Sequence, residues 1–170
     1  EGYGKFGTVG NGRGVTSGDN SDANYQELIP VQTSDLGGAA TSISASEGTT
    51  CVVVSGTLKC WGKNNLGQAG FATDTDSGGY ETVGIRVPTA TAPTATAMTN
   101  ADEVAKSSGS GYHSCAVLTD GRIQCWGTWS SGGTAYFGCD PCTVPAEYPP
   151  GFFETVTMPA GRTAKSVAVG

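Results

Sequence analysis

Two segments of the chain place short apolar runs on either side of a turn, and each segment begins and ends with cysteine. The first reads Cys-Val-Val-Val-Ser-Gly-Thr-Leu-Lys-Cys at residues 51–60. The second reads Cys-Ala-Val-Leu-Thr-Asp-Gly-Arg-Ile-Gln-Cys at residues 115–125. β-Branched residues favour extended backbone, and Ser-Gly and Asp-Gly are typical of tight turns. The pattern predicts two antiparallel hairpins.

Each hairpin has a defined register if its two cysteines face one another. With Cys51 opposite Cys60, a two-residue Ser-Gly turn remains, and with Cys115 opposite Cys125 a three-residue loop ending in glycine remains. Directly opposed residues in an antiparallel pair have Cα atoms about 4.5–5.5 Å apart, which a disulfide can span. We therefore expect two cross-strand disulfides. Because the loops that they close are short, each should contribute toward the low end of about 2–4 kcal/mol.

The hairpins belong to a longer internal repeat. Glycine-rich segments begin at Gly2, Gly62 and Gly127, and a Cys-Trp pair stands just before the second and third of them. A short serine-bearing element precedes each hairpin, at residues 42–46 and 106–110, and residues 166–170 carry a third copy of it. Each unit is therefore predicted to be a strand, a turn, a hairpin, Trp-Gly, a glycine-rich loop and a long connection.

This repeat predicts a single all-β module over residues 1–170 with few or no helices. We divide it into units at 1–40, 41–103, 104–162 and 163–170, of which the first and last are partial. Composition favours the same class, because glycine supplies 27 residues and only 14% of residues are charged. Abundant Gly, Ser, Thr and Val suit short strands joined by tight turns.

Charge and hydropathy exclude two classes of partner. A net charge of -6 disfavours nucleic acid, whose binding requires clusters of Lys and Arg. The longest apolar runs fall far below the roughly 20 residues that span a bilayer, so we expect no membrane insertion.

Cysteine usage indicates the compartment. Six cysteines in a small, lysine-poor chain are typical of an oxidising environment, so we expect an extracellular or cell-surface protein. The chain begins with Glu1 rather than Met, and we take it as a processed or excised piece. The Thr- and Pro-rich stretch at residues 87–97 is a candidate for O-linked sugars on composition alone.

Two stretches resemble the repeats of the regulator-of-chromosome-condensation family. They are His-Ser-Cys-Ala-Val-Leu-Thr-Asp-Gly-Arg-Ile-Gln-Cys-Trp-Gly at residues 113–127 and Trp-Gly-Lys-Asn-Asn-Leu-Gly-Gln-Ala-Gly at residues 61–70. The resemblance implies a β-propeller of four-stranded blades. Family members serve as nucleotide-exchange factors, enzyme inhibitors and docking scaffolds, so the resemblance selects no single activity. No stretch of this chain carries residues onto which the exchange activity can be mapped.

The chain departs from the family pattern in ways that bear on assembly. Its units run to about 60–65 residues, longer than the family norm, and its third glycine-rich loop is interrupted by aromatic residues and a cysteine. Propellers close with 4–8 blades, which two complete units cannot supply. Either the chain is part of a longer protein, or its exposed blade edges pair with other subunits. Unpaired strand edges are a template for another chain, so we expect head-to-tail joining, which builds a filament if the rotation between copies does not close.

Few residues are candidates for chemistry. His113 is the sole histidine and is expected in the turn before a strand. Its neighbour Ser114 should point to the opposite face of the strand, so the two do not form a nucleophile–base pair. Cys139-Asp-Pro-Cys142 is expected to form a tight loop disulfide, with a metal site or other pairings as alternatives.

Two further groups of residues are candidates for binding. Acidic loops after the first two glycine-rich segments are weak candidates for calcium, the one cofactor considered; they contain Asp19, Asp22, Asp74 and Asp76. Aromatic residues gather in the irregular third loop, as a contact surface or as a small core beneath the loop: Trp129, Tyr136, Phe137, Tyr148, Phe152 and Phe153. Trp61 and Trp126 follow their hairpins at equivalent positions, which predicts packing between blades.

The sequence therefore predicts a non-enzymatic extracellular building block that joins other copies of itself, or adjoining repeats, through open blade edges. The alternative is a propeller module of a larger secreted protein that binds a protein or a glycan. An enzyme is disfavoured, because no nucleophile–base pair or pair of carboxylates stands at a workable spacing.

Overall fold

The computed structural model describes residues 2–3, 26–27, 36–46, 48–63, 68–70, 98–106, 112–128, 154–156 and 158–169. Every regular element in this part of the chain is a β-strand, as predicted. The strands are β1 (Gly2–Tyr3), β2 (Gln26–Glu27), β3 (Ala40–Ser46), β4 (Thr49–Val54), β5 (Thr57–Gly62), β6 (Ala101–Lys106), β7 (Tyr112–Leu118), β8 (Ile123–Thr128) and β9 (Glu154–Val156).

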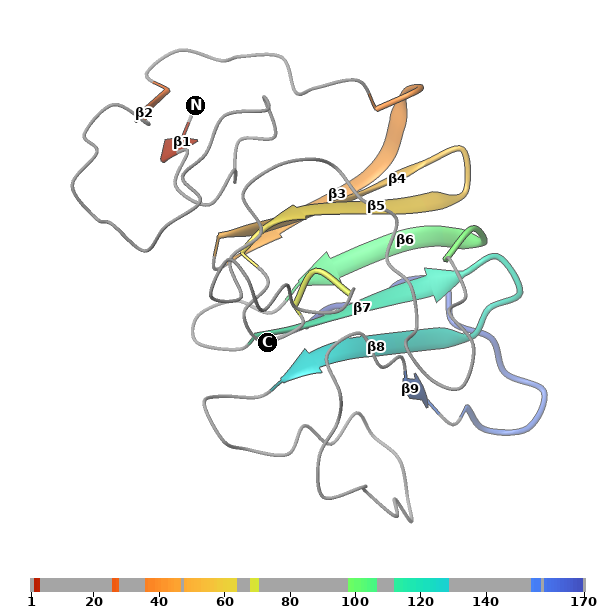
Figure 1. Ribbon diagram of the computed structural model, residues 1–170. Helices are drawn as coiled ribbons and strands as arrows, with labels where there is room; N and C mark the ends of the chain where they lie inside the picture. The colour runs from red at the N-terminus through yellow and green to blue at the C-terminus, as the bar shows by residue number, and fades with distance from the viewer. Residues whose placement is uncertain are drawn as a thin grey trace.

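The strands form three antiparallel sheets. Strands β1 and β2 make a short pair, β3-β4-β5 make a three-stranded sheet, and β6-β7-β8-β9 make a four-stranded sheet. Figure 1 shows the β3–β5 sheet in orange and yellow beside the β6–β9 sheet in green and blue. The two larger sheets have the same strand order along the chain, and we call them blade 1 and blade 2. Contacts between β3 and β6 bring the blades together.

The hairpin of blade 1 has the predicted register. Cys51 lies opposite Cys60 and Val54 opposite Thr57, which leaves the two-residue turn. Its residues Ser55 and Gly56 have φ angles of 50° and 77°. Two successive left-handed residues characterise the turn that matches the twist of antiparallel strands, so the hairpin closes without splaying.

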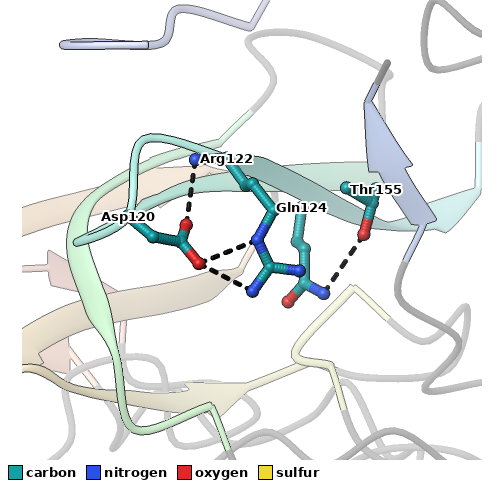
Figure 2. A network of polar contacts seen from close by, with 4 residues as sticks. All are labelled: Asp120, Arg122, Gln124 and Thr155. Atoms are coloured by element: carbon teal, nitrogen blue, oxygen red, sulfur yellow. Dashed lines mark hydrogen bonds and ion pairs between the residues drawn. The ribbon is translucent and has the colours of Figure 1, made fainter. Parts of the chain in front are cut away.

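The hairpin of blade 2 also has the predicted register, with Cys115 opposite Cys125. Figure 2 shows how its loop is held: the Asp120 carboxylate accepts hydrogen bonds from the Arg122 backbone N–H at 3.1 Å and from Arg122 Nε at 2.8 Å. These bonds lower the pKa of Asp120, and the same side-chain bond raises the pKa of Arg122. Beyond the loop, Gln124 on β8 donates to Thr155 Oγ1 on β9.

The two first strands, β3 and β6, are equivalent, and both have a register shift at their start. The shift lies between Ala40 and Ser42 in β3 and between Ala101 and Glu103 in β6. Counting from these shifts, Ile43 in β3 occupies the position of Val104 in β6. Such a shared irregularity marks a bulge common to both blades.

The prediction that residues 106–110 repeat residues 42–46 is wrong. Ser44 lies opposite Cys51, seven positions on, whereas Ala105 lies opposite Cys115, ten positions on. The link between the first strand and the hairpin is therefore three residues longer in blade 2. The spacing between the two hairpins consequently does not apply to the first strands. Strand β6 also spans the boundary drawn between residues 103 and 104.

Residues 166–169 are described and form no strand, contrary to prediction. An extended segment gains ladder hydrogen bonds only from a neighbouring strand, and no described strand pairs with it. His113 lies inside β7 and is buried, so its predicted place in a turn before the strand is also wrong.

Candidate blade-joining interface

The described core lies between the two blades. Apolar residues of both blades contribute to one buried cluster: Cys51, Val53, Leu58, Cys60, Ala69, Met98, Ala101, Val104, Ala116, Leu118 and Trp126. The structure joins Cys51 to Cys60 and Cys115 to Cys125, with Cα atoms 4.2 Å and 4.0 Å apart. The first of these disulfides packs inside the cluster, so the bond that closes hairpin 1 also supports blade 2.

Serine hydroxyls of β3 join the two first strands. The Val104 N–H donates to Ser42 Oγ at 3.1 Å, and the Lys106 N–H donates to Ser44 Oγ at 3.0 Å. These two amides point away from β7, so without the hydroxyls they would be buried donors lacking acceptors. An unsatisfied buried donor costs about 1–3 kcal/mol, so each hydroxyl holds β6 in register with β3.

Backbone hydrogen bonds fasten the turn of hairpin 1 to the segment that enters β6. The Ala101 N–H donates to the Gly56 carbonyl at 2.8 Å, and the Leu58 N–H donates to the Met98 carbonyl at 3.1 Å. The contact recurs one unit later, where the Ala164 N–H donates to the Gly121 carbonyl at 2.8 Å. Ala164 therefore follows blade 2 as Ala101 follows blade 1.

The glycine-rich loop that follows blade 1 reaches into blade 2. The backbone carbonyl of Gln68 accepts hydrogen bonds from Lys106 Nζ, Ser114 Oγ and Trp126 Nε1, each at 3.1 Å. Lys106 Nζ also donates to Ser114 Oγ at 2.6 Å. Trp126 thus packs between blades, as predicted. Trp61 is buried too, in a separate cluster with Val52 and Val54.

Burial changes the titration of this cluster. Desolvation lowers the pKa of Lys106 from 10.5 to about 7. Desolvation also lowers the pKa of His113, and the charge of Lys106 lowers it further. A neutral lysine amine keeps two N–H donors, enough for the Gln68 carbonyl and the Ser114 hydroxyl. The amine can therefore fill its place without carrying charge.

Blade 1 exposes the face that blade 2 buries. Val104 on β6 is 3% exposed, whereas its counterpart Ile43 on β3 is 68% exposed. Ala40 and Ala45 are exposed as well, although their counterparts Ala101 and Lys106 are buried. Elsewhere on the same side of blade 1, Val52, Val54 and Trp61 are buried. Among the described residues on this side of blade 1, the exposed apolar side chains therefore lie on β3.

Most of the other predicted site residues lie outside the described residues. This holds for the loop cysteines Cys139 and Cys142, for the candidate calcium ligands Asp19, Asp22, Asp74 and Asp76, and for the aromatic residues Trp129, Tyr136, Phe137, Tyr148, Phe152 and Phe153. Within the described ranges, no cluster of His, Cys, Asp and Glu is suited to hold a metal ion. Nor does this part of the chain contain a helix long and apolar enough to cross a bilayer.

Sequence reasoning missed the residues that make the junction. Ser42, Ser44, Gln68 and Lys106 connect the blades, and none was singled out. The alternation of serine with Ile43 along β3 was the available signal, since it places hydroxyls on one face and apolar groups on the other. Nothing in the sequence marked Lys106, because a lysine is normally expected on the surface.

The fold and the junction define a protein of antiparallel β-blades that pack side by side. Residues 107–132 match the family model described as the Regulator of chromosome condensation (RCC1) repeat. No curated protein matches the sequence.

Solved structures with RCC1-type propellers share this fold. Human WBSCR16 aligns with a TM-score of 0.60 and 15% identity, over 96% of this chain and 36% of that chain. Yeast RCC1 (Prp20), solved with Kap60 bound, aligns with a TM-score of 0.53 and 12% identity, over 83% of this chain and 27% of that chain.

Prp20p from Saccharomyces cerevisiae, reported with its binding properties to Gsp1p and histones, aligns with a TM-score of 0.55 and 13% identity. The alignment covers 83% of this chain and 28% of that chain. The chain thus spans 27–36% of the length of these structures. Identities at this level show the fold alone.

Proposed function

We propose that this chain is a non-enzymatic building block, acting outside the cell or at its surface, that joins head to tail with other copies of itself. The observation that carries the proposal is the exposed face of β3. The same face of β6 forms the interior of a blade junction, and Ile43 stands at 68% exposure where Val104 is buried. An exposed, uncharged strand at the edge of a sheet is a template for a further partner.

The buried polar cluster supports a structural role. Lys106 and Ser114 are a lysine–serine pair at hydrogen-bond distance, which resembles the pairing used by some hydrolases. Here the Ser114 side chain is 0% exposed, and its hydroxyl donates to the Gln68 carbonyl. A hydroxyl enclosed between two blades cannot reach a substrate, so the pair serves packing.

The disulfides support an extracellular setting. Both described hairpins contain one, and each joins opposed residues of neighbouring strands. Disulfides of this kind persist where the environment is oxidising. A cytosolic form would lose both bonds to reduction, and with them the stability that each hairpin gains.

Self-association of the purified 170-residue chain tests the proposal. We expect sedimentation velocity to show species whose size grows with concentration, and electron microscopy to show linear assemblies. A monodisperse monomer at the highest soluble concentration would overturn the proposal. The disulfides are kept oxidised throughout, and thiol quantification confirms it.

A second function, binding of a partner protein by a propeller module, is favoured by the comparisons. Two of the similar structures concern a protein that binds others: Kap60 in one, Gsp1p and histones in the other. A chain of this kind would remain monomeric and bind a partner with saturable stoichiometry. The measurement of self-association therefore also separates the two functions.

A further inference from the structure

The Cys51–Cys60 disulfide lies beneath blade 2. Both cysteines are 0% exposed, and both belong to the buried cluster between the blades. The strands that carry them, β4 and β5, each contact β6. Blade 2 contributes the following residues to the cluster: Ala101, Val104, Ala116, Leu118 and Trp126. The first strand and the hairpin of blade 2 therefore form part of the cover over the bond.

The two faces of hairpin 1 have different neighbours. Neighbouring positions on a strand point to opposite faces. Cys51 and Val53 face blade 2 as members of the cluster between the blades, whereas Val52 and Val54 belong to a separate cluster with Trp61. Residues of this second cluster keep their contacts when the blades part, and they lose them only when hairpin 1 itself unfolds. Opening of the junction and unfolding of the hairpin can therefore be told apart.

Hydrogen bonds between the blades, distinct from those that build each hairpin, hold this cover in place. Ser44 Oγ accepts the Lys106 N–H at 3.0 Å, and the Gln68 carbonyl accepts a hydrogen bond from Trp126 Nε1 at 3.1 Å. Neither bond belongs to the ladder between β4 and β5 or to the ladder between β7 and β8. Local opening of such a contact requires less free energy than unfolding of the whole chain. Blade 2 can therefore lift from blade 1 while both hairpins stay paired.

Reduction of a disulfide requires direct access to one of its sulfurs. An external thiolate attacks one Sγ, the S–S bond breaks, and the other cysteine leaves as a thiolate that takes up a proton. When the reductant is a dithiol, its second thiolate displaces the remaining cysteine, which is also protonated, and the dithiol becomes a cyclic disulfide. Two electrons and two protons thus pass from the dithiol to Cys51 and Cys60. Neither cysteine is accessible to this attack while blade 2 is seated, since both are fully buried.

We propose that the junction between the blades is a gate on the Cys51–Cys60 disulfide, so that a thiol reductant reaches the bond when blade 2 lifts from blade 1 with both hairpins still paired. The gate also works in the forming direction, because oxidation of the two thiols needs the same access. The bond therefore has to form before blade 2 is seated or during an opening. This inference goes beyond the proposed function, because it concerns contacts within one chain.

The test compares variants of the full 170-residue chain that weaken different contacts. Ser44→Ala removes the acceptor of the Lys106 N–H and should favour opening of the junction. Trp126→Phe removes the donor to the Gln68 carbonyl and should act in the same direction. Val52→Ala is the matched control, because it weakens blade 1 on the face that points away from blade 2. Circular dichroism and urea unfolding establish that each variant is folded and by how much each is destabilised.

The measured quantity is the rate at which the Cys51–Cys60 bond is reduced in the folded protein. Each protein is incubated with dithiothreitol at one pH and one low protein concentration, so that self-association does not enter, and mass spectrometry of alkylated peptides follows the bond. Ser44→Ala should raise the rate about 5- to 100-fold, because loss of a buried acceptor raises the population of the open form. Val52→Ala should leave the rate close to that of the wild type.

Low concentrations of urea provide a second readout. The dependence of stability on urea scales with the surface that is exposed, so lifting of blade 2 should have a much smaller urea dependence than global unfolding. A reduction rate that rises with urea as steeply as the global unfolding constant would overturn the inference. Equal acceleration by Ser44→Ala and Val52→Ala would also overturn it, because attack would then follow unfolding of blade 1. An unchanged rate in both Ser44→Ala and Trp126→Phe would show that the thiol reaches the bond without parting the blades.

Discussion

The Lys106 amine lies 2.6 Å from the Ser114 hydroxyl oxygen, and both groups are buried where the glycine-rich loop that follows blade 1 meets blade 2. A lysine in this position is costly when charged, because burial removes its hydration. Desolvation lowers its pKa to about 7. The junction between blades is therefore sensitive to pH near 7.

We expect the free energy of unfolding to rise with pH above about 7. Lys106 has a pKa of about 7 in the folded chain and 10.5 as an ordinary lysine, so between these values the unfolded chain binds the extra proton. Stability then increases by up to about 1.4 kcal/mol per pH unit and is lost again as the pH falls toward 7. The lowered pKa of His113 acts below its ordinary value of 6.5, outside this window.

The variant Lys106→Met should remove this dependence. Met fills a similar volume without an ionisable group, so the slope from Lys106 disappears and stability below pH 7 rises by a few kcal/mol. Urea unfolding at several pH values measures both effects. Lys165→Met, at an exposed position, should keep the wild-type slope. An unchanged slope in Lys106→Met would show that the amine is hydrated in solution.

Loss of the first disulfide should destabilise the whole junction. The double variant Cys51→Ala with Cys60→Ala removes a bond that closes a ten-residue loop, worth about 2–3 kcal/mol, and leaves space in the cluster between blades. Denaturant unfolding of the oxidised proteins gives the difference. Equal stability of the double variant and the wild type would mean that β4 and β5 pair equally well without the disulfide.

Substitution of Ser55 should change the stability of hairpin 1 in both directions. Ser55 is the one described residue other than glycine with a positive φ angle, at 50°. Asparagine tolerates this backbone better than serine, so Ser55→Asn should add about 0.5–1 kcal/mol. Ser55→Val should destabilise, because a β-branched side chain crowds the same backbone. Thermal unfolding of the two variants should move in opposite directions.

Gly121→Ala should weaken the attachment of Thr163 and Ala164 to the turn of blade 2. Gly121 has a φ angle of 80°, and an added Cβ would collide with the Thr163 side chain. The combined strain and clash should cost about 2–3 kcal/mol. Gly161→Ala, where φ is 72° and no atom lies near the added Cβ, isolates the backbone cost. Adding Thr163→Gly to Gly121→Ala should recover the part of the loss due to the clash, measured as a double-mutant cycle.

Ser42→Ala should lower the free energy of unfolding of the chain, and Ser166→Ala should not. Removing the Ser42 hydroxyl leaves the Val104 N–H buried without its acceptor, at a cost of about 1–3 kcal/mol. Ser166 is exposed, so its substitution should stay within about 0.5 kcal/mol in dilute protein. Unfolding measured at low concentration compares the pair. A neutral Ser42→Ala would show that a water molecule can replace the hydroxyl.

The sequence could predict what short-range chemistry determines. The registers of both hairpins follow from the cysteines and from turn lengths of two and three residues, and both predictions are confirmed. The strand β6 could not be aligned in the same way, because the Ser- and Gly-rich link that follows it is three residues longer and carries no cysteine to fix the register. The spacing between the two hairpins, applied to residues 42–46, therefore predicts the matching strand at residues 106–110, whereas it lies at residues 101–106.

The junction itself depends on groups that lie far apart along the chain. Ser42 meets Val104 across 62 residues, and Gln68 meets Trp126 across 58 residues. Local pattern shows that such side chains alternate on a strand, but only the packing of two blades shows which hydroxyl meets which amide. The buried Lys106 was beyond prediction for the same reason, since its environment is made by a loop of the preceding unit.

The hydroxyls of Ser42 and Ser44 have a consequence for how chains of this kind can change over time. The junction between these units combines backbone hydrogen bonds with serine hydroxyls that accept backbone N–H groups. The side-chain part can be changed by single substitutions. Units exchanged between related chains should keep their hairpins intact and fail at their borders. Compatibility between neighbouring units should therefore depend on the residues at their junction.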